Sequence, residues 1–317
     1  MIGFMDCFGA SDIGRQRPSN EDHFLIADIC KSMRVHQTSL GLDHQSRLFG
    51  NTQGKLLIVA DGMGGNESGE RASQLVLDTI VDYVLNRLSW LLQKDPENEQ
   101  DFIEQLKYSL RECQNVIDNE SAMVPQRRKM GSTLTLAYIV WPRVFLIHVG
   151  DSRCYLLRDH RLQQLTRDHT LAQLVDENTR SSKLDSAIAA QEAKGKALSH
   201  VLWNVIGGGS EKPHPDATAF DLQIGDTLLL CTDGLSNMVT PEHICKQLDS
   251  KASSAETCGK LLNEANLNGG VDNITVVVSR FLNQIPPEEL MQELERPLEL
   301  PADTDEFPKM QTVKLTV

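Results

Sequence analysis

Two apolar segments of this chain each run directly into an aspartate, and this repeated construction constrains the fold more than any other feature. The first, residues 56–60, leads into Asp61, and the second, residues 228–231, leads through one threonine into Asp233. Short apolar runs bounded by turn residues are typical of strands in a layered core. The pattern therefore predicts a β-rich core with a carboxylate at the end of at least two of its strands.

The remaining elements fall into blocks of strands and blocks of helices. Apolar runs bounded by glycine, proline or aspartate predict strands at residues 23–29, 55–60, 132–141, 144–149, 154–157, 227–231 and 273–281. Apolar residues at helical spacing, with Pro241 opening one helix and Ser254 capping another, predict helices at residues 70–92, 101–123, 241–248 and 255–265. Strands in hairpin succession, with helices apart from them, indicate an α+β fold. We expect a four-layer α-β-β-α sandwich in which two mainly antiparallel sheets are flanked by helix pairs.

We expect one domain over residues 1–282 and a tail over residues 283–317. The tail is acidic and contains several prolines, so it is predicted to be partly disordered. Residues 170–209 are polar, helical in character and interrupt two strand signals, which favours a flap. Residues 31–54 lack clear periodicity and are interpreted as an insertion.

Charge and cysteine content exclude several classes of protein. A formal net charge of −13 argues against general binding of nucleic acid or anionic membranes, which needs clustered Lys and Arg. The seven cysteines occur singly, as expected for reduced thiols. Residues 1–14 lack the pattern of a secretory signal, and no apolar run approaches the ~18 residues of a membrane span. We therefore expect a cytoplasmic protein with no nucleic-acid partner and no membrane span.

Five short acidic signatures lie in order along the chain, each beside glycine, asparagine or a hydroxyl residue. Their aspartates are Asp22, Asp61, Asp151, Asp233 and Asp272. Carboxylates, together with a backbone carbonyl such as that of Gly62, are the oxygen ligands that hard divalent cations prefer. Taken singly, each aspartate is as typical of a glycine-rich turn or a helix cap, and Asp151 is expected in a tight hairpin. Taken as a set, they predict a dinuclear metal site.

Arg17 precedes Asn20-Glu21-Asp22 by a short turn. Its planar guanidinium offers a fork of donors that suits a phosphate, while Asp22 or Glu21 could accept hydrogen bonds from metal-bound waters. A surface ion pair of the arginine with an acidic neighbour is the alternative. Arg17 and Asp61 are the candidate catalytic residues.

Several familiar catalytic motifs do not occur in the sequence. It contains no Gly-x-x-x-x-Gly-Lys-Ser/Thr loop, no His-Glu-x-x-His helix, no cysteine with an arginine six positions later and no Gly-x-Ser-x-Gly elbow. His148 lies in an apolar strand and is expected in the core, and Asp168-His169 is expected to order the entrance of the flap. We assign no catalytic role to His148, His169 or His200.

The combined signatures resemble those of the metal-dependent serine/threonine protein phosphatases of type 2C. The matching motifs arrive in family order over residues 7–281 and are Asp12-x-Gly14-x-x-Arg17-x-x-Asn20-Glu21-Asp22, Asp61-Gly62-Met63-Gly64-Gly65, Gly131-Ser132-Thr133, Gly150-Asp151-Ser152-Arg153, Thr232-Asp233-Gly234 and Gly270-x-Asp272-Asn273-x-Thr275. The resemblance implies a β-sandwich flanked by helix pairs, with two Mg²⁺ or Mn²⁺ ions in a cleft at one end.

The resemblance also implies a role for each matching residue. Asp61 would bridge both ions, the Gly62 carbonyl and waters held by Asp22 would serve one ion, and Asp233 with Asp272 would serve the other. Arg17 would hold the phosphate, and in bacterial relatives a third ion lies near the positions of Asp151 and Asp233. Met63 stands where the animal branch has a histidine, which resembles bacterial members and implies that a water protonates the leaving group.

The leading hypothesis is hydrolysis of phosphoserine and phosphothreonine in proteins, without a phosphoenzyme, by a water that paired cations ionise. The partners would be phosphorylated proteins, Ser/Thr kinases or their substrates among them, in a bacterial cytosol. Two alternatives stay open: a catalytically silent phosphoprotein-binding module with the same fold, and a phosphatase of small phosphoesters. The intact set of carboxylates argues against the silent module.

Overall fold

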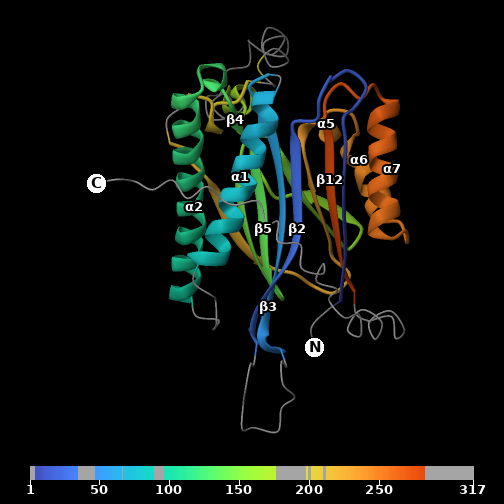
Figure 1. Ribbon diagram of the computed structural model, residues 1–317. Helices are drawn as coiled ribbons and strands as arrows, with labels where there is room; N and C mark the ends of the chain where they lie inside the picture. The colour runs from blue at the N-terminus through green and yellow to red at the C-terminus, as the bar shows by residue number, and fades with distance from the viewer. Residues whose placement is uncertain are drawn as a thin grey trace, which may run out of the picture.

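The computed structural model describes residues 4–34, 47–65, 67–88, 96–175, 198, 201–209 and 212–282. Two antiparallel sheets stack face to face in this part of the chain (Figure 1). Helices α1 (Glu67–Asn86) and α2 (Pro96–Met123) cover one sheet, and α6 (Pro241–Leu248) and α7 (Ser254–Leu267) cover the other. The predicted four-layer α-β-β-α sandwich is confirmed.

The sheet under α1 and α2 has seven strands. Its order is β10 (Asp216–Asp221), β6 (Arg143–Val149), β5 (Leu134–Val140), β3 (Arg47–Met63), β4 (Gly131–Ser132) and β9 (Ile206–Gly207), and β2 (Asp22–Arg34) also pairs with β3. The sheet under α6 and α7 has five strands in the order β1 (Phe4–Asp12), β12 (Ile274–Leu282), β11 (Thr227–Cys231), β7 (Arg153–Arg158) and β8 (Arg161–Gln164). Two further short elements are the 3-10 helix η1 (Pro125–Arg127) and α5 (Asp233–Ser236).

The apolar runs of the sequence are continuous because the central strands are buried on both faces. In β3, Leu57 and Val59 point into the core between the sheets, whereas Leu56 and Ile58 point into the core beneath α1 and α2. In β11, Leu228 and Leu230 join the same inter-sheet core, and their neighbours face α6 and α7. Successive strand residues point to opposite faces, so a strand between two apolar layers needs no polar alternation.

The strands that the sequence pattern does not predict all lie at the ends of the sheets. They are β1, β8, β9 and β10, which end the strand orders of the two sheets. Edge strands are paired on one side only. Most side chains of β8 are exposed, and those of β10 alternate between exposed and half-buried, so neither strand buries a continuous apolar run. Their sequences therefore lack the apolar signature of the central strands.

Three further expectations need correction or fall outside the described residues. Residues 31–34 and 47–54 of the predicted insertion have regular structure, because β2 and β3 continue through them as a paired ladder with a register shift between Cys30 and Ser32. The cap of α7 is Ser253, not Ser254, and it forms a capping box with Glu256. Residues 35–46, most of the predicted flap at residues 176–197, and the tail at residues 283–317 lie outside the described residues.

The segment around Asp151 is not a hairpin, as the sequence suggested, but a crossover between the two sheets. The strand before it, β6, pairs with β5 and β10, whereas the strand after it, β7, pairs with β11 and β8. Gly150 has a φ of +111°, a conformation that favours glycine and turns the chain out of one sheet. We call residues 150–152 the crossover below.

The inter-sheet core predicts a clear difference between two leucines. Leu57 is 0% exposed between the sheets, while Leu267 is 77% exposed on α7. We expect Leu57→Ala to lower the free energy of unfolding by about 2–5 kcal/mol, because it removes buried methyl groups and leaves a cavity. Leu267→Ala is the matched control and should change it by less than about 0.5 kcal/mol. Urea titration followed by circular dichroism measures both, and equal effects would contradict the assignment of this core.

Candidate functional site

Asp22 and Asp61 meet at the end of the β2–β3 ladder. The two residues are register partners in this antiparallel pair. Beside them the Gly62 amide of β3 donates at 3.2 Å to the carbonyl of Glu21, the residue directly before β2. The sheet itself therefore brings the first two predicted carboxylates together.

A threonine hydroxyl connects Asp22 to the opposite sheet. The Thr232 hydroxyl donates to Asp22 Oδ2 at 2.8 Å and accepts from the Thr275 amide at 3.0 Å. Thr232 follows β11 directly, and Thr275 belongs to β12. This buried contact joins the seven-stranded sheet to the five-stranded sheet at the end where the aspartates lie.

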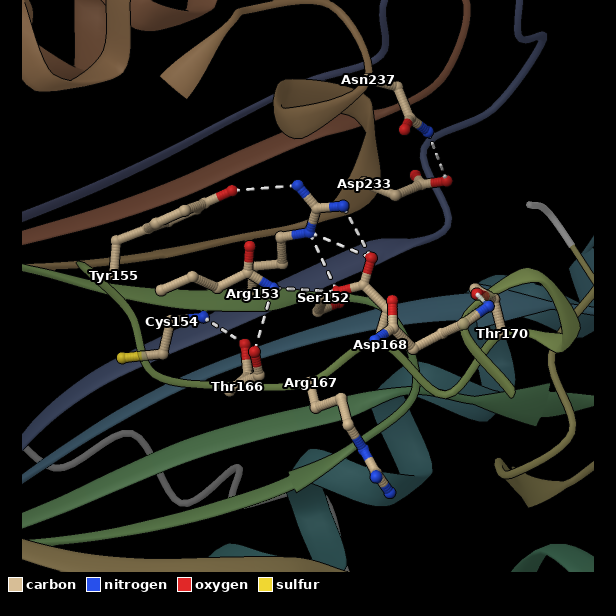
Figure 2. Close-up of polar contacts among 12 residues, drawn as sticks. Ser152, Arg153, Cys154, Tyr155, Thr166, Arg167, Asp168, Thr170, Asp233 and Asn237 are labelled. Atoms are coloured by element: carbon tan, nitrogen blue, oxygen red, sulfur yellow. Dashed lines mark hydrogen bonds and ion pairs between the residues drawn. The ribbon is translucent and has the colours of Figure 1, made fainter. Parts of the chain in front are cut away.

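Asp233 and Asp272 come from neighbouring segments of the five-stranded sheet. Asp233 is the first residue of α5, and its Oδ2 accepts from Asn237 at 3.1 Å (Figure 2). Gly234 allows α5 to approach the start of β12, because a Cβ at this position would lie 1.9 Å from the Asn273 carbonyl oxygen. The close contact holds Asp233 next to the segment that carries Asp272.

Thr133 links the backbone of Asp61 to the crossover that carries Asp151. Its hydroxyl accepts from the Asp61 amide at 2.9 Å, so its own proton is free to bond to Ser152 Oγ at 2.9 Å. The Thr133 amide also donates to the Asp61 carbonyl at 2.9 Å. One side chain thus fixes the spacing between two predicted ligand segments.

The predicted site residues converge on one cleft at this end of the sandwich. The cleft has a volume of about 500 Å³, and its lining includes Arg17, Asp61, Gly62, Asp151, Asp233 and Asp272. Asp22 lies outside the lining and is 5% exposed. Figure 1 shows β4 and α5, which border the site, at the same end of the molecule.

The carboxyl groups of this cluster are strongly desolvated. Burial is the largest cause that raises the pKa of Asp22 to about 7 and that of Asp151 to about 8, and the charge of the nearby Asp233 carboxylate contributes to both shifts. Asp61 keeps some exposure at the cleft, but the surrounding protein excludes water from its carboxyl group. The neighbouring carboxylates of Asp22 and Asp233 also repel its charge. Both effects raise the pKa of Asp61 well above the ordinary value. Ionised together, these groups would repel one another in a poorly hydrated place.

This electrostatic situation fits a divalent cation. Asp22 Oδ1 is buried and accepts no hydrogen bond from the part of the chain that the structure describes. Positive charge at the cleft would offset both the repulsion and the loss of hydration, and carboxylate and carbonyl oxygens are the ligands of Mg²⁺ and Mn²⁺. The donor set therefore suits the ions that the sequence predicts.

The side chains do not stand as a finished ligand cage. Within the described ranges, no three His, Cys, Asp or Glu side chains are grouped closely enough to hold an ion. Asp272 instead pairs with Arg17, with Nη2 and Oδ2 2.6 Å apart. The structure thus brings Arg17 and Asp272 together as an ion pair in the cleft, and their roles toward phosphate and metal stay predictions.

Several residues of the site have no assigned role in the sequence-based prediction. Thr133 and Thr232 belong to the quoted motifs, but nothing in a linear pattern shows that their hydroxyls join the two sheets. Met238 and Leu202 add apolar surface to the cleft, the latter from the base of the predicted flap. Thr232 stands directly before Asp233, which was an available signal, whereas Thr133 is adjacent to none of the five aspartates in the sequence.

Comparison with known proteins identifies the family. A family model described as Protein phosphatase 2C matches residues 39–268. The chain belongs to the protein phosphatase 2C family. The resemblance that the sequence motifs indicate is therefore confirmed.

The related proteins are bacterial members of the protein phosphatase 2C family. The chain is 36% identical over 225 residues to the serine/threonine protein phosphatase PstP of Mycobacterium tuberculosis, covering 71% of this chain but only 40% of that protein's length. It is 35% identical over 233 residues to the serine/threonine phosphatase stp of Listeria monocytogenes, covering 72% of this chain and 86% of that protein.

A solved structure of the same family also matches. The catalytic domain of PstP in complex with two manganese ions superposes with a TM-score of 0.63 at 31% identity, covering 88% of this chain and 99% of that chain.

No helix in the described part of this protein is long and apolar enough to cross a membrane.

The double hydrogen bond of Thr133 leads to a prediction about stability. Thr133→Val keeps the side-chain shape but leaves the Asp61 amide and Ser152 Oγ without this partner. We expect a loss of about 1–3 kcal/mol in the free energy of unfolding, because buried polar groups are costly to leave unsatisfied. Thr133→Ser keeps the hydroxyl and should lose less. Urea titration of both variants checks the difference, and a valine variant as stable as the serine variant would refute the bridge.

The raised carboxyl pKa values predict a pH dependence of the metal-free protein. An unfolded aspartate has a pKa near 3.8, whereas the folded protein raises the pKa to about 7 for Asp22 and about 8 for Asp151. At a pH between these values, the folded state binds more protons than the unfolded state. The free energy of unfolding in chelator should therefore fall as the pH rises from about 4 to about 8 and change little above that range. Asp151→Asn, which cannot titrate at this position, should show a smaller decline.

Added Mn²⁺ should reverse this trend, because ions bind the deprotonated carboxylates. Differential scanning calorimetry should give a larger Mn²⁺-induced rise in Tm at high pH than at low pH within this window. A metal-free protein that becomes more stable toward alkaline pH would contradict the assigned desolvation.

Proposed function

We propose that this protein hydrolyses phosphoserine and phosphothreonine in other proteins at a centre of two divalent ions, Mg²⁺ or Mn²⁺. One observation carries the proposal. Aspartates from both sheets converge on a single cleft, where they are desolvated and repel one another. The family relationship and the two manganese ions of the PstP catalytic domain support it.

Each residue of the cleft has a proposed task. Asp61, the Gly62 carbonyl, Asp233 and Asp272 would hold the two ions, and Asp22 would accept hydrogen bonds from waters bound there. Asp151 and Asp233 would serve a third ion. Bound at this place, the ions supply Lewis acidity that turns a water into a nucleophile and offsets charge on the phosphoryl group.

Arg17 would bind the phosphate of the substrate. Its side chain is 50% exposed at the cleft, and the contact with Asp272 uses one of its five N–H donors. The remaining donors suit the oxygens of a phosphate, and the carboxylate of Asp272 holds the guanidinium in place before substrate arrives. Arg17 thereby orients the phosphoryl group and contributes positive charge to the transition state.

The leaving alkoxide would take its proton from water. Met63 lines the cleft at the motif position where the animal branch has a histidine, and the described lining contains no histidine at all. A thioether carries no proton to donate. The substrates are proposed to be phosphorylated proteins of the cytoplasm, including Ser/Thr kinases or their targets.

A metal and variant series tests the proposal. With Mn²⁺ the protein should hydrolyse both an aryl phosphate and a phosphothreonine peptide, and chelator should abolish the activity. Asp61→Asn and Asp272→Ala should each lower kcat by about 100-fold or more, because the charge that holds the ions is lost. Steady-state assays of released phosphate measure these effects.

A buried aspartate outside the cleft gives the control. Asp226 is 3% exposed and pairs with Arg158, so Asp226→Asn perturbs a comparable buried carboxylate without touching the site. This variant should keep near-normal kcat. Activity that survives chelation, or an Asp61→Asn enzyme with normal turnover, would overturn the proposal, and hydrolysis of aryl phosphate alone would indicate a phosphatase of small phosphoesters.

A further inference from the structure

A buried histidine holds the crossover from behind. His169 is 0% exposed, and its ring Nδ1 lies 3.1 Å from the Gly150 amide, while its own backbone amide donates to the Gly150 carbonyl at 2.8 Å. Both backbone groups of Gly150 are thus bonded to one residue. Asp151, the next residue, points into the cleft as part of its lining.

The partners of the imidazole determine which nitrogen carries the proton. Nδ1 faces two donors, the Gly150 amide and the Asn204 side-chain amide at 2.9 Å, so it must be the acceptor. Nε2 lies 3.2 Å from Asp216 Oδ2 and therefore carries the proton and donates it. Asn204 is fixed in turn, because its Oδ1 accepts from the His214 amide at 3.0 Å and its Nδ2 also donates to the His214 carbonyl at 2.7 Å.

The same residue joins the base of the predicted flap. The Trp203 amide donates to the His169 carbonyl at 3.0 Å, and Thr170 pairs with Leu202, which lines the cleft. A neighbouring ion pair fastens this segment a second time. Asp168 accepts a bidentate contact from Arg153, with distances of 2.9 Å from Nε to Oδ1 and 2.6 Å from Nη2 to Oδ2 (Figure 2).

We infer that His169 is a positioning residue for the phosphatase reaction: its neutral imidazole, protonated at Nε2, fixes the Gly150 amide and so the direction of Asp151, and its backbone couples this turn to the base of the flap. The inference rests on the proposed function for its effect on turnover. The hydrogen bonds that carry it are independent of that function.

Two isosteric substitutions separate the two sides of the ring. In His169→Asn the side-chain oxygen can occupy the place of Nδ1 and accept from Gly150, but the contact with Asp216 is lost. In His169→Gln the terminal amide can reach Asp216, but nothing replaces the acceptor for Gly150. Both variants remove the ring, and each keeps one of its two contacts, so the comparison weighs the bond to Gly150 against the bond to Asp216.

We expect kcat with Mn²⁺ to fall about tenfold or more further in His169→Gln than in His169→Asn, because a displaced turn moves Asp151 away from its working position. Amide hydrogen exchange of Gly150, followed by nuclear magnetic resonance, should be about tenfold faster in His169→Gln than in His169→Asn, which corresponds to the loss of one hydrogen bond. Equal kcat and equal exchange in the two variants would overturn the inference.

His148 provides the matched control for disturbing a buried histidine. Its ring lies 4.9 Å from that of His169, it is 1% exposed, and its own ring bonds to the Thr135 hydroxyl and the Arg167 carbonyl, not to Gly150. His148→Gln should lower Tm as His169→Gln does and keep kcat close to that of the wild type. If His148→Gln loses as much activity as His169→Gln, the effect is general destabilisation and the inference fails.

The two failures are distinguishable. An inactive wild type would refute the proposed function, while the exchange rates of the Gly150 amide would still test the contact with His169. An active wild type whose two His169 variants behave alike would refute the inference and leave the proposed function intact.

Discussion

Mutual repulsion and desolvation of carboxylates at one end of the sandwich is the interaction on which the site depends. Asp61 lies among Asp22, Asp233 and Asp151, and burial is the largest cause that raises the pKa of Asp22, Asp61 and Asp151. Such an arrangement is unfavourable for the isolated chain, and a packed sandwich must hold it in place. A divalent cation would convert the same arrangement from a cost into a source of binding energy.

Hydroxyl groups, not ion pairs, hold most of this arrangement together. Thr133 connects the Asp61 backbone to the crossover, and Thr232 connects Asp22 to the second sheet. A neutral hydroxyl can donate to a carboxylate or accept from an amide without adding charge that would compete with a cation. Two ion pairs are the exceptions: Arg153 with Asp168, and Arg17 with Asp272, which is the more exposed of the two.

Behind the cleft, the crossover joins the strand order of the fold to the proposed chemistry. β6 and β7 belong to different sheets, so the turn between them must change direction sharply, and Gly150 makes that possible. A turn of this kind is held only by what packs behind it. His169 and the pair of Arg153 with Asp168 supply these contacts, and both come from the segment that leads into the predicted flap.

Local sequence determined the central strands, the main helices and the positions of Asp61 and Asp233 at strand ends, because apolar runs and Asp-Gly turns act over a few residues. The helix at residues 241–248 agrees with α6, since proline at its start and apolar spacing are local signals. Strands β1, β8, β9 and β10 were missed because their sequences carry no long apolar run, and the side chains of β8 and β10 are largely exposed or alternate.

Only the tertiary structure decided how distant segments meet. Asp151 sits in a crossover because of pairing partners far along the chain, and Arg17 bonds to Asp272 across 255 positions. The contacts of His169 with Gly150 and Asn204 likewise depend on how the two sheets stack. Neither periodicity nor turn chemistry encodes such contacts, since they follow from the packing of whole layers and not from any short stretch of residues.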